Sequence, residues 1–112
     1  MIVDDSEELI ASVSRLLGSQ GLDVVGHALT GDEALRLAQD LEPDVALVDI
    51  ELGEEDGIAL SRRFADRAPA TRVILISSYG PEDLRDLIAH SPAAGFLPKT
   101  DLGAAAIARV LG

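Results

Sequence analysis

The chain has 112 residues, 47% of them apolar and only 3% aromatic, which suits one compact domain with an aliphatic core. It has no cysteine, which excludes disulfides, thiolate metal sites and cysteine nucleophiles. Its net charge of -11 argues against direct nucleic-acid binding and is compatible with binding cations or a basic partner surface. No apolar run approaches the ~18 residues of a membrane span, and no signal peptide is visible, so we expect a cytoplasmic protein without a membrane anchor.

The chain opens with a short apolar run, Ile2–Val3, that stops at two adjacent carboxylates, Asp4 and Asp5. Apolar residues at helical spacing then predict a helix over 6–17, with Gly18 as its stop. Asp5 or the serine after it could cap this helix, which is compatible with a second role for the carboxylates.

A second strand is expected over 24–29, where two valines begin another apolar run. The letters TGDE at 30–33 form a capping box, which predicts the start of a helix that ends before Pro43. The continuous apolar run over 44–49 predicts a third strand, and this run also ends in a carboxylate, that of Asp49.

The second half of the chain continues the same alternation. Residues 50–57 are rich in glycine and acid, which predicts a loop. The elements expected after it are a helix over 58–66, a strand over 71–77, a helix over 81–90, a strand over 95–99 and a helix over 102–111.

Five strands alternating with five helices predict an α/β fold of (βα)5 type, with one five-stranded parallel sheet. The strands are continuously apolar, as expected when helices cover both faces of the sheet. In such doubly wound sheets the working site lies outside the carboxyl ends of the strands.

Five polar side chains stand at these carboxyl ends: Asp4, Asp5, Asp49, Ser77 and Lys99. Carboxylates a few Å apart repel by roughly 4 kcal/mol per pair at an effective dielectric of 20, and a divalent cation would relieve this. Oxygen ligands favour Mg²⁺ or Mn²⁺, and the lysine suits a phosphoryl oxygen. The set points to phosphoryl transfer, with a carboxylate as a possible nucleophile.

Four segments, IVDDSEELI, ALVDIELGEEDG, ILISS and GFLPK, together resemble the response-regulator receiver domain of two-component signalling. The resemblance covers essentially the whole chain, with the motifs in order at successive strand ends. It implies the flavodoxin-like strand order 2-1-3-4-5 and one receiver domain over 1–112. Strand one is shorter than is usual in the family, which suggests truncation at the N-terminus, and no room is left for an output domain.

The resemblance also implies roles for the residues at the strand ends. Asp49 is expected to be the phosphoacceptor, with Asp5 as a direct Mg²⁺ ligand and Asp4 acting mainly through water. The backbone carbonyl of Glu51 would supply a further metal ligand. Lys99 would pair with a phosphoryl oxygen.

Ser77 would hydrogen-bond another phosphoryl oxygen and would act as a switch together with Phe96, although core filling explains Phe96 equally well. Glu51 and Tyr79 follow the acceptor and the serine by two positions, so their side chains are expected to flank the path of water to the phosphoryl group. The family often has proline where this chain has Gly53, which suggests a looser loop.

The function implied is a Mg²⁺-dependent signalling switch that catalyses its own phosphorylation and dephosphorylation. A histidine kinase or phosphotransfer protein would be the donor, and transcription the controlled output. A homodimer through the fourth helix, fifth strand and fifth helix is a further expectation. The main alternative is a pseudo-receiver that binds partners without phosphorylation. A haloacid-dehalogenase-like phosphatase and a flavodoxin-type cofactor site fit the motifs less well.

Overall fold

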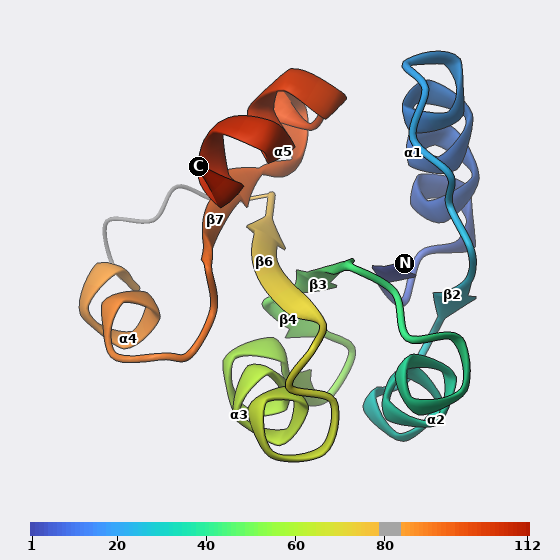
Figure 1. Cartoon of the computed structure of the whole chain (residues 1–112). Coiled ribbons are helices and arrows are strands. Elements are labelled where there is room, and N and C mark those ends of the chain that lie inside the picture. Colours follow the sequence, from blue (N-terminus) through green and yellow to red (C-terminus); the bar gives the residue numbers. More distant parts are fainter. Residues whose placement is uncertain (79–83) are drawn as a thin grey trace.

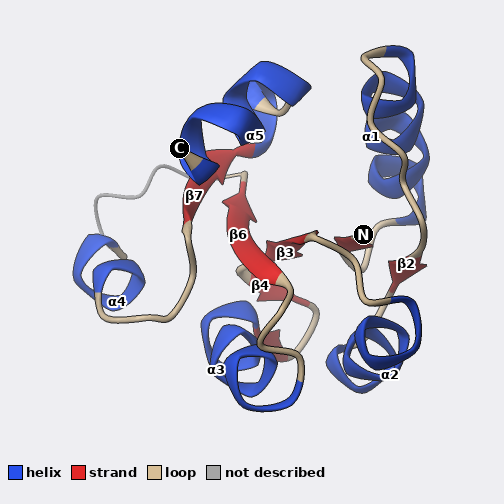
Figure 2. Ribbon diagram, in the orientation of Figure 1, coloured by secondary structure: helices blue, strands red, loops and turns tan. Residues whose placement is uncertain are grey.

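The computed structural model describes residues 1–78 and 84–112, which form helices on both faces of one sheet (Figures 1 and 2). The sheet has five parallel strands in the order β2-β1-β3-β6-β7. These strands are β1 (Ile2–Val3), β2 (His27–Ala28), β3 (Val45–Asp49), β6 (Arg72–Ser77) and β7 (Gly95–Pro98). Counted within this sheet, the order is 2-1-3-4-5, which confirms the predicted doubly wound fold.

The helices are α1 (Glu7–Ser19), α2 (Gly31–Leu41), α3 (Gly57–Arg67), α4 (Arg85–Ala89) and α5 (Ala104–Leu111). A short 3-10 helix, η1 (Lys99–Asp101), follows β7. Two further strands, β4 (Glu51–Leu52) and β5 (Glu55–Asp56), pair antiparallel as a hairpin outside the main sheet. Within the described residues, no helix combines the length and the apolar character needed to cross a lipid bilayer.

Successive side chains of the central strands enter two apolar layers on opposite faces of the sheet. In β3, Ala46 and Val48 belong to the layer beneath α2 and α3, whereas Leu47 belongs to the layer beneath α1 and α5. Figure 1 shows these two pairs of helices on opposite sides of the sheet. Because both faces are covered, the strands must be apolar at every position, which explains their continuous hydrophobic runs.

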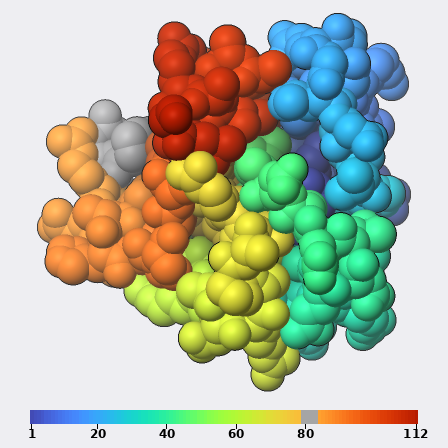
Figure 3. Space-filling model, in the orientation of Figure 1, coloured from blue at the N-terminus to red at the C-terminus, as the bar shows by residue number. Residues whose placement is uncertain are grey.

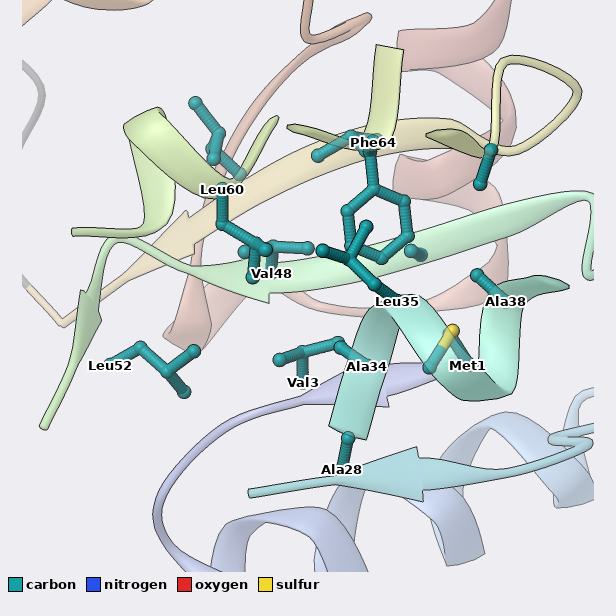
Figure 4. Close-up of a cluster of buried hydrophobic side chains, with 14 of the residues drawn as sticks. Met1, Val3, Ala28, Ala34, Leu35, Ala38, Val48, Leu52, Leu60 and Phe64 are labelled. Atoms are coloured by element: carbon teal, nitrogen blue, oxygen red, sulfur yellow. The ribbon is translucent and has the colours of Figure 1, made fainter. Parts of the chain in front are cut away.

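Phe64 of α3 is fully buried and lies in the layer beneath α2 and α3. Figure 4 shows its ring among the side chains of Leu35, Leu60 and Val48. Aliphatic residues supply nearly all the rest of this layer, as expected from a composition with few aromatics.

Side-chain caps set the start of three helices. Ser6 Oγ accepts a hydrogen bond from the backbone N–H of Leu9 at 3.2 Å, which begins α1. Thr30 Oγ1 accepts from the N–H of Glu33 at 3.3 Å, as the TGDE motif predicts. Asp56 caps α3, and the chain therefore enters each of these helices at a fixed point.

The predicted second strand is longer than the observed one. It was expected over 24–29, but β2 comprises only His27–Ala28, and Val25 is 45% exposed. The reason is the length of β1, whose two residues offer pairing positions to only two residues of β2, His27 and Ala28. Without a neighbour on that side, the residues before Gly26 do not join the sheet.

Other differences are small. Helix α1 continues through Gly18 to Ser19. The predicted loop over 50–57 contains the β4–β5 hairpin, and Lys99 begins η1 rather than ending a strand. The helix expected over 81–90 is present as α4 from Arg85, and its first residues lie outside the described part of the chain.

Candidate functional site

The carboxyl ends of four strands meet at one edge of the sheet, here called the acidic rim. Asp4 follows β1, Asp49 ends β3, Ser77 ends β6 and Lys99 follows β7. Parallel pairing of adjacent strands holds these ends in register, with Asp49 opposite Ile76 in β6. The structure therefore brings together the residues that the sequence predicted at the strand ends.

The Lys99 ammonium lies between two buried carboxylates. Its Nζ is 3.1 Å from Asp49 Oδ2, to which it donates a hydrogen bond, and 2.9 Å from Asp4 Oδ2. Asp4 and Asp49 are 0% and 3% exposed, so these ion pairs are shielded from solvent. Two anions thus share one cation, and the rim keeps an excess of negative charge.

The electrostatics of the rim favour a further cation. Burial raises the pKa of the Asp49 carboxyl to about 6, and the Asp4 charge adds to this, although the Glu51 amide and Lys99 oppose it. Partial burial of Lys99 alone would lower the pKa of its ammonium. Its hydrogen bonds and its attraction to Asp4 and Asp49 outweigh that effect, so the net shift is upward.

Asp5 completes a group of three carboxylates at the rim. One oxygen each of Asp4, Asp5 and Asp49 lie within 4.8 Å of one another. Asp4 Oδ1 accepts a hydrogen bond from the Ser6 amide at 2.9 Å. Asp4 Oδ2 is buried and lies 2.9 Å from Lys99 Nζ, with no other polar partner among the described residues. Three carboxylates with a single ammonium among them form a donor set that fits a hard divalent cation.

The loop after β3 is held against Asp49 and the end of that strand. The Glu51 amide donates to Asp49 Oδ1 at 3.1 Å, and the Gly57 amide donates to the carbonyl of Ile50 at 2.9 Å. A Cβ atom at Gly57 would overlap the backbone carbonyl of Asp49. Glycine is therefore required at position 57, where α3 begins. The side chain of Glu51 is exposed to solvent.

The remaining predicted residues lie near the rim or outside the described chain. Ser77 is 1% exposed at the end of β6. Phe96 of β7 is half-buried and packs against the layer beneath α2 and α3, beside Leu75 of β6. Tyr79 falls outside the described residues.

One contact of the rim was not predicted from the sequence. Glu55, in the hairpin, accepts hydrogen bonds from the backbone amide of Gly31 at the start of α2. Three glutamates occur in this loop, and sequence alone does not distinguish them.

An apolar cavity of about 510 Å³ lies at the opposite edge of the sheet, lined in part by Met1, Leu17 and Ile107.

Comparison with known proteins identifies relatives that share this fold. A family model described as the response regulator receiver domain matches residues 1–108. A response regulator from Burkholderia pseudomallei, solved with a phosphorylated aspartic acid, a calcium ion and citrate, superimposes with a TM-score of 0.85. It is 26% identical and is matched over 99% of this chain and 64% of that one.

The receiver domain of the putative response regulator NarL from Mycobacterium tuberculosis has a TM-score of 0.81 at 32% identity, over 99% of this chain and 94% of that one. Among curated proteins, the response regulator GacA from Pseudomonas aeruginosa is 29% identical over 88% of this chain and 47% of its own length. The chain thus spans about half the length of this relative.

Proposed function

The chain belongs to the response regulator receiver domain family, whose members act in phosphorylation-based signalling, and from this we propose that Asp49 is its phosphoacceptor. The observation that carries the proposal is the placement of the Asp49 carboxylate, buried at the end of β3 and held between the Glu51 amide and the Lys99 ammonium. We further propose that residues 1–112 act as one receiver unit.

The proposed reaction transfers a phosphoryl group to a carboxylate. An oxygen of Asp49 attacks the phosphorus of a phosphohistidine, the bond from phosphorus to the imidazole nitrogen breaks, and the nitrogen keeps the electron pair. Lys99 then pairs with a phosphoryl oxygen, and the Ser77 hydroxyl donates to another. Water later attacks the phosphorus and releases inorganic phosphate, which returns Asp49 to a carboxylate.

Receiver domains generally bind Mg²⁺ at an acidic pocket, and the donor set here fits that ion. We propose that Asp5 and Asp49 would hold Mg²⁺ or Mn²⁺ directly, together with the Glu51 carbonyl, and Asp4 through water. When bound, the ion supplies charge neutralisation for the phosphoryl oxygens. The calcium ion and phosphorylated aspartic acid in the Burkholderia relative support this assignment.

Receiver domains interact with histidine kinases or phosphotransfer proteins, and we propose such a protein as the donor here. We propose that phosphorylation moves Ser77 and Phe96 and changes the face made by α4, β7 and α5. A second copy of the chain or an output partner would bind that face. Similarity to a putative transcriptional regulator from Pseudomonas aeruginosa, 30% identical over 90% of this chain and 49% of its own length, supports a transcriptional output. The pseudo-receiver alternative is not favoured, because the full set of acids, serine and lysine is present.

Intact mass after incubation with acetyl phosphate and Mg²⁺ tests the proposal. We expect wild type to gain one phosphoryl group, and expect none in Asp49→Asn or in the presence of a chelator. Asp44→Asn is the matched control, because Asp44 is an exposed acid just before the same strand, at its opposite end. No adduct in wild type, or an adduct that persists in Asp49→Asn, would contradict the assignment.

A further inference from the structure

The hairpin that follows Asp49 is tied to a helix far away in the sequence. Both carboxylate oxygens of Glu55 accept from the backbone amide of Gly31, at 3.2 and 3.0 Å. Gly31 is the first residue of α2 and lies 24 residues earlier in the chain. The amide groups at a helix N-terminus carry partial positive charge, so a carboxylate is the favoured partner there.

This contact depends on glycine at position 31. A Cβ atom there would lie 2.7 Å from Glu55 Oε1 and 3.2 Å from Leu60 Cδ1. Gly31 is buried, so the carboxylate of Glu55 lies directly against the backbone at the start of α2. There is therefore no room for a larger residue at position 31 unless the Glu55 and Leu60 side chains move.

The hairpin connects Glu55 to Asp49 through its cross-strand pairs. Glu55 is paired with Leu52 across the hairpin, and Asp56 is paired with Glu51. Leu52 is 1% exposed and anchors β4 in the apolar layer beneath α2 and α3. The Glu51 amide donates to Asp49, so a shift of the hairpin would move a group that touches the acceptor.

The turn of the hairpin contains a glycine in a left-handed conformation. Gly53 has a φ of 60°, in the left-handed region, which proline cannot adopt. A proline could therefore not occupy this position without a change in the turn. The other end of the hairpin is fixed by Asp56 Oδ1, which accepts from the Ile58 amide at 2.9 Å. Glu55 supplies a second fixed point, on α2.

A nearby ion pair does not replace this contact. Arg63 of α3 lies 2.7 Å from Asp32 of α2, but both side chains are well exposed, and such surface pairs contribute little. The pair also joins the two helices without touching the hairpin.

We propose that Glu55 is a positioning residue for the phosphoryl-transfer site. By clamping the hairpin to the start of α2, it holds the Glu51 backbone in place beside Asp49, where its amide binds the acceptor and its carbonyl would face the metal ion. This inference rests on the proposed function.

The test compares wild type with Glu55→Ala and Glu55→Gln in the full chain. Glu54→Ala is the matched control, because Glu54 is an adjacent exposed glutamate that makes no hydrogen bond or ion pair within the described part of the chain. The first readout is hydrogen exchange of the Gly31 and Glu51 amides by NMR in the metal-free protein. We expect faster exchange at both amides in Glu55→Ala and unchanged exchange in the control.

The second readout is Mg²⁺ affinity, from a titration of the metal alone followed by backbone amide shifts. We expect Glu55→Ala to weaken affinity about tenfold, as for other residues that orient a metal ligand. The control should stay within about twofold. Glu55→Gln keeps one acceptor oxygen and should fall between the two.

Urea unfolding separates positioning from general stability. A lower unfolding midpoint, with wild-type Mg²⁺ affinity and wild-type exchange at Glu51, would mean that Glu55 only caps α2 and would overturn the inference. If Glu55→Ala does not fold, the same comparison is made with Glu55→Gln. Wild type that binds Mg²⁺ but takes up no phosphoryl group would contradict the proposed function, while the affinity readout would still decide the role of Glu55. Wild type that binds no Mg²⁺ would overturn both.

Discussion

The acidic rim and the α4 segment both adjoin β6 and β7, yet they are built in different ways. At the rim, Asp4 and Asp49 are almost completely buried and share Lys99. In α4 no residue is buried, and Leu87 is 52% exposed. The space-filling view shows this segment projecting from one side of the molecule (Figure 3).

This difference indicates how a local event could reach a distant surface. Regions with few buried contacts open and shift at low free energy, whereas closely packed regions do not. Charge added at the rim would therefore be accommodated more easily by α4 and β7 than by α2 and α3, which pack around Phe64. Phe96 of β7 is half-buried and packs against the layer beneath α2 and α3.

The largest expected effect comes from truncating a side chain in the buried layer, compared with truncating one in the exposed α4. Phe64→Ala should lower the free energy of unfolding by about 3–5 kcal/mol, because it leaves a cavity in a fully buried layer. Leu87→Ala removes an exposed side chain and should change it by roughly 0.5 kcal/mol or less. Urea unfolding measures both. Similar losses for the two variants would show that α4 is packed as tightly as α3.

A second prediction concerns the charge at the rim. The pKa of Asp49, about 6 in the fold, exceeds its ordinary value near 4, so the protonated carboxyl is favoured in the folded state. Its stabilising contribution is complete below about pH 4 and is lost as the pH rises through 6. In metal-free protein, the stability of Asp49→Asn relative to wild type should therefore grow by roughly 2–3 kcal/mol between pH 4 and 8.

Urea unfolding across this pH range, with chelator present, measures that difference. Asp66→Asn serves as the control and should run parallel to wild type, because Asp66 is an exposed acid of α3 with no hydrogen bond or ion pair among the described residues. A constant difference between Asp49→Asn and wild type would show that the rim does not penalise the ionised Asp49 carboxylate.

The smallest expected effect comes from replacing a glycine by alanine at two positions, one at the rim and one in α1. Gly57→Ala would push a methyl group against the Asp49 backbone and should destabilise the fold by about 1–3 kcal/mol. Gly18→Ala, in α1, meets open space and should stabilise it by up to about 1 kcal/mol. Thermal and urea unfolding give the sign of each change. Equal signs would show that the rim backbone relaxes around an added side chain.

Much of the site could be predicted from the sequence because parallel strands bring their carboxyl ends to one edge. Asp4, Asp49, Ser77 and Lys99 were each found at the end of an apolar run, and no tertiary information was needed. The same logic gave the strand order once the resemblance to receiver domains was included.

Features that depend on packing between distant segments could not be predicted in this way. The length of β2 depends on its neighbour β1 and not on the valines at 24 and 25. Glu55 was missed because its partner, Gly31, is brought to it by the packing of α2 against α3. Neither feature leaves a distinct local pattern in the sequence.

The most direct test of the proposed coupling is amide hydrogen exchange of the whole chain with Mg²⁺, before and after addition of beryllium fluoride as a phosphoryl mimic. We expect exchange to change at the rim and across α4 and β7, residues 84–98, while α2 and α3 stay as they were. Asp49→Asn should show neither change. Protection confined to the rim, with α4 and β7 unchanged, would contradict the view that the loosely packed face responds to charge added at Asp49.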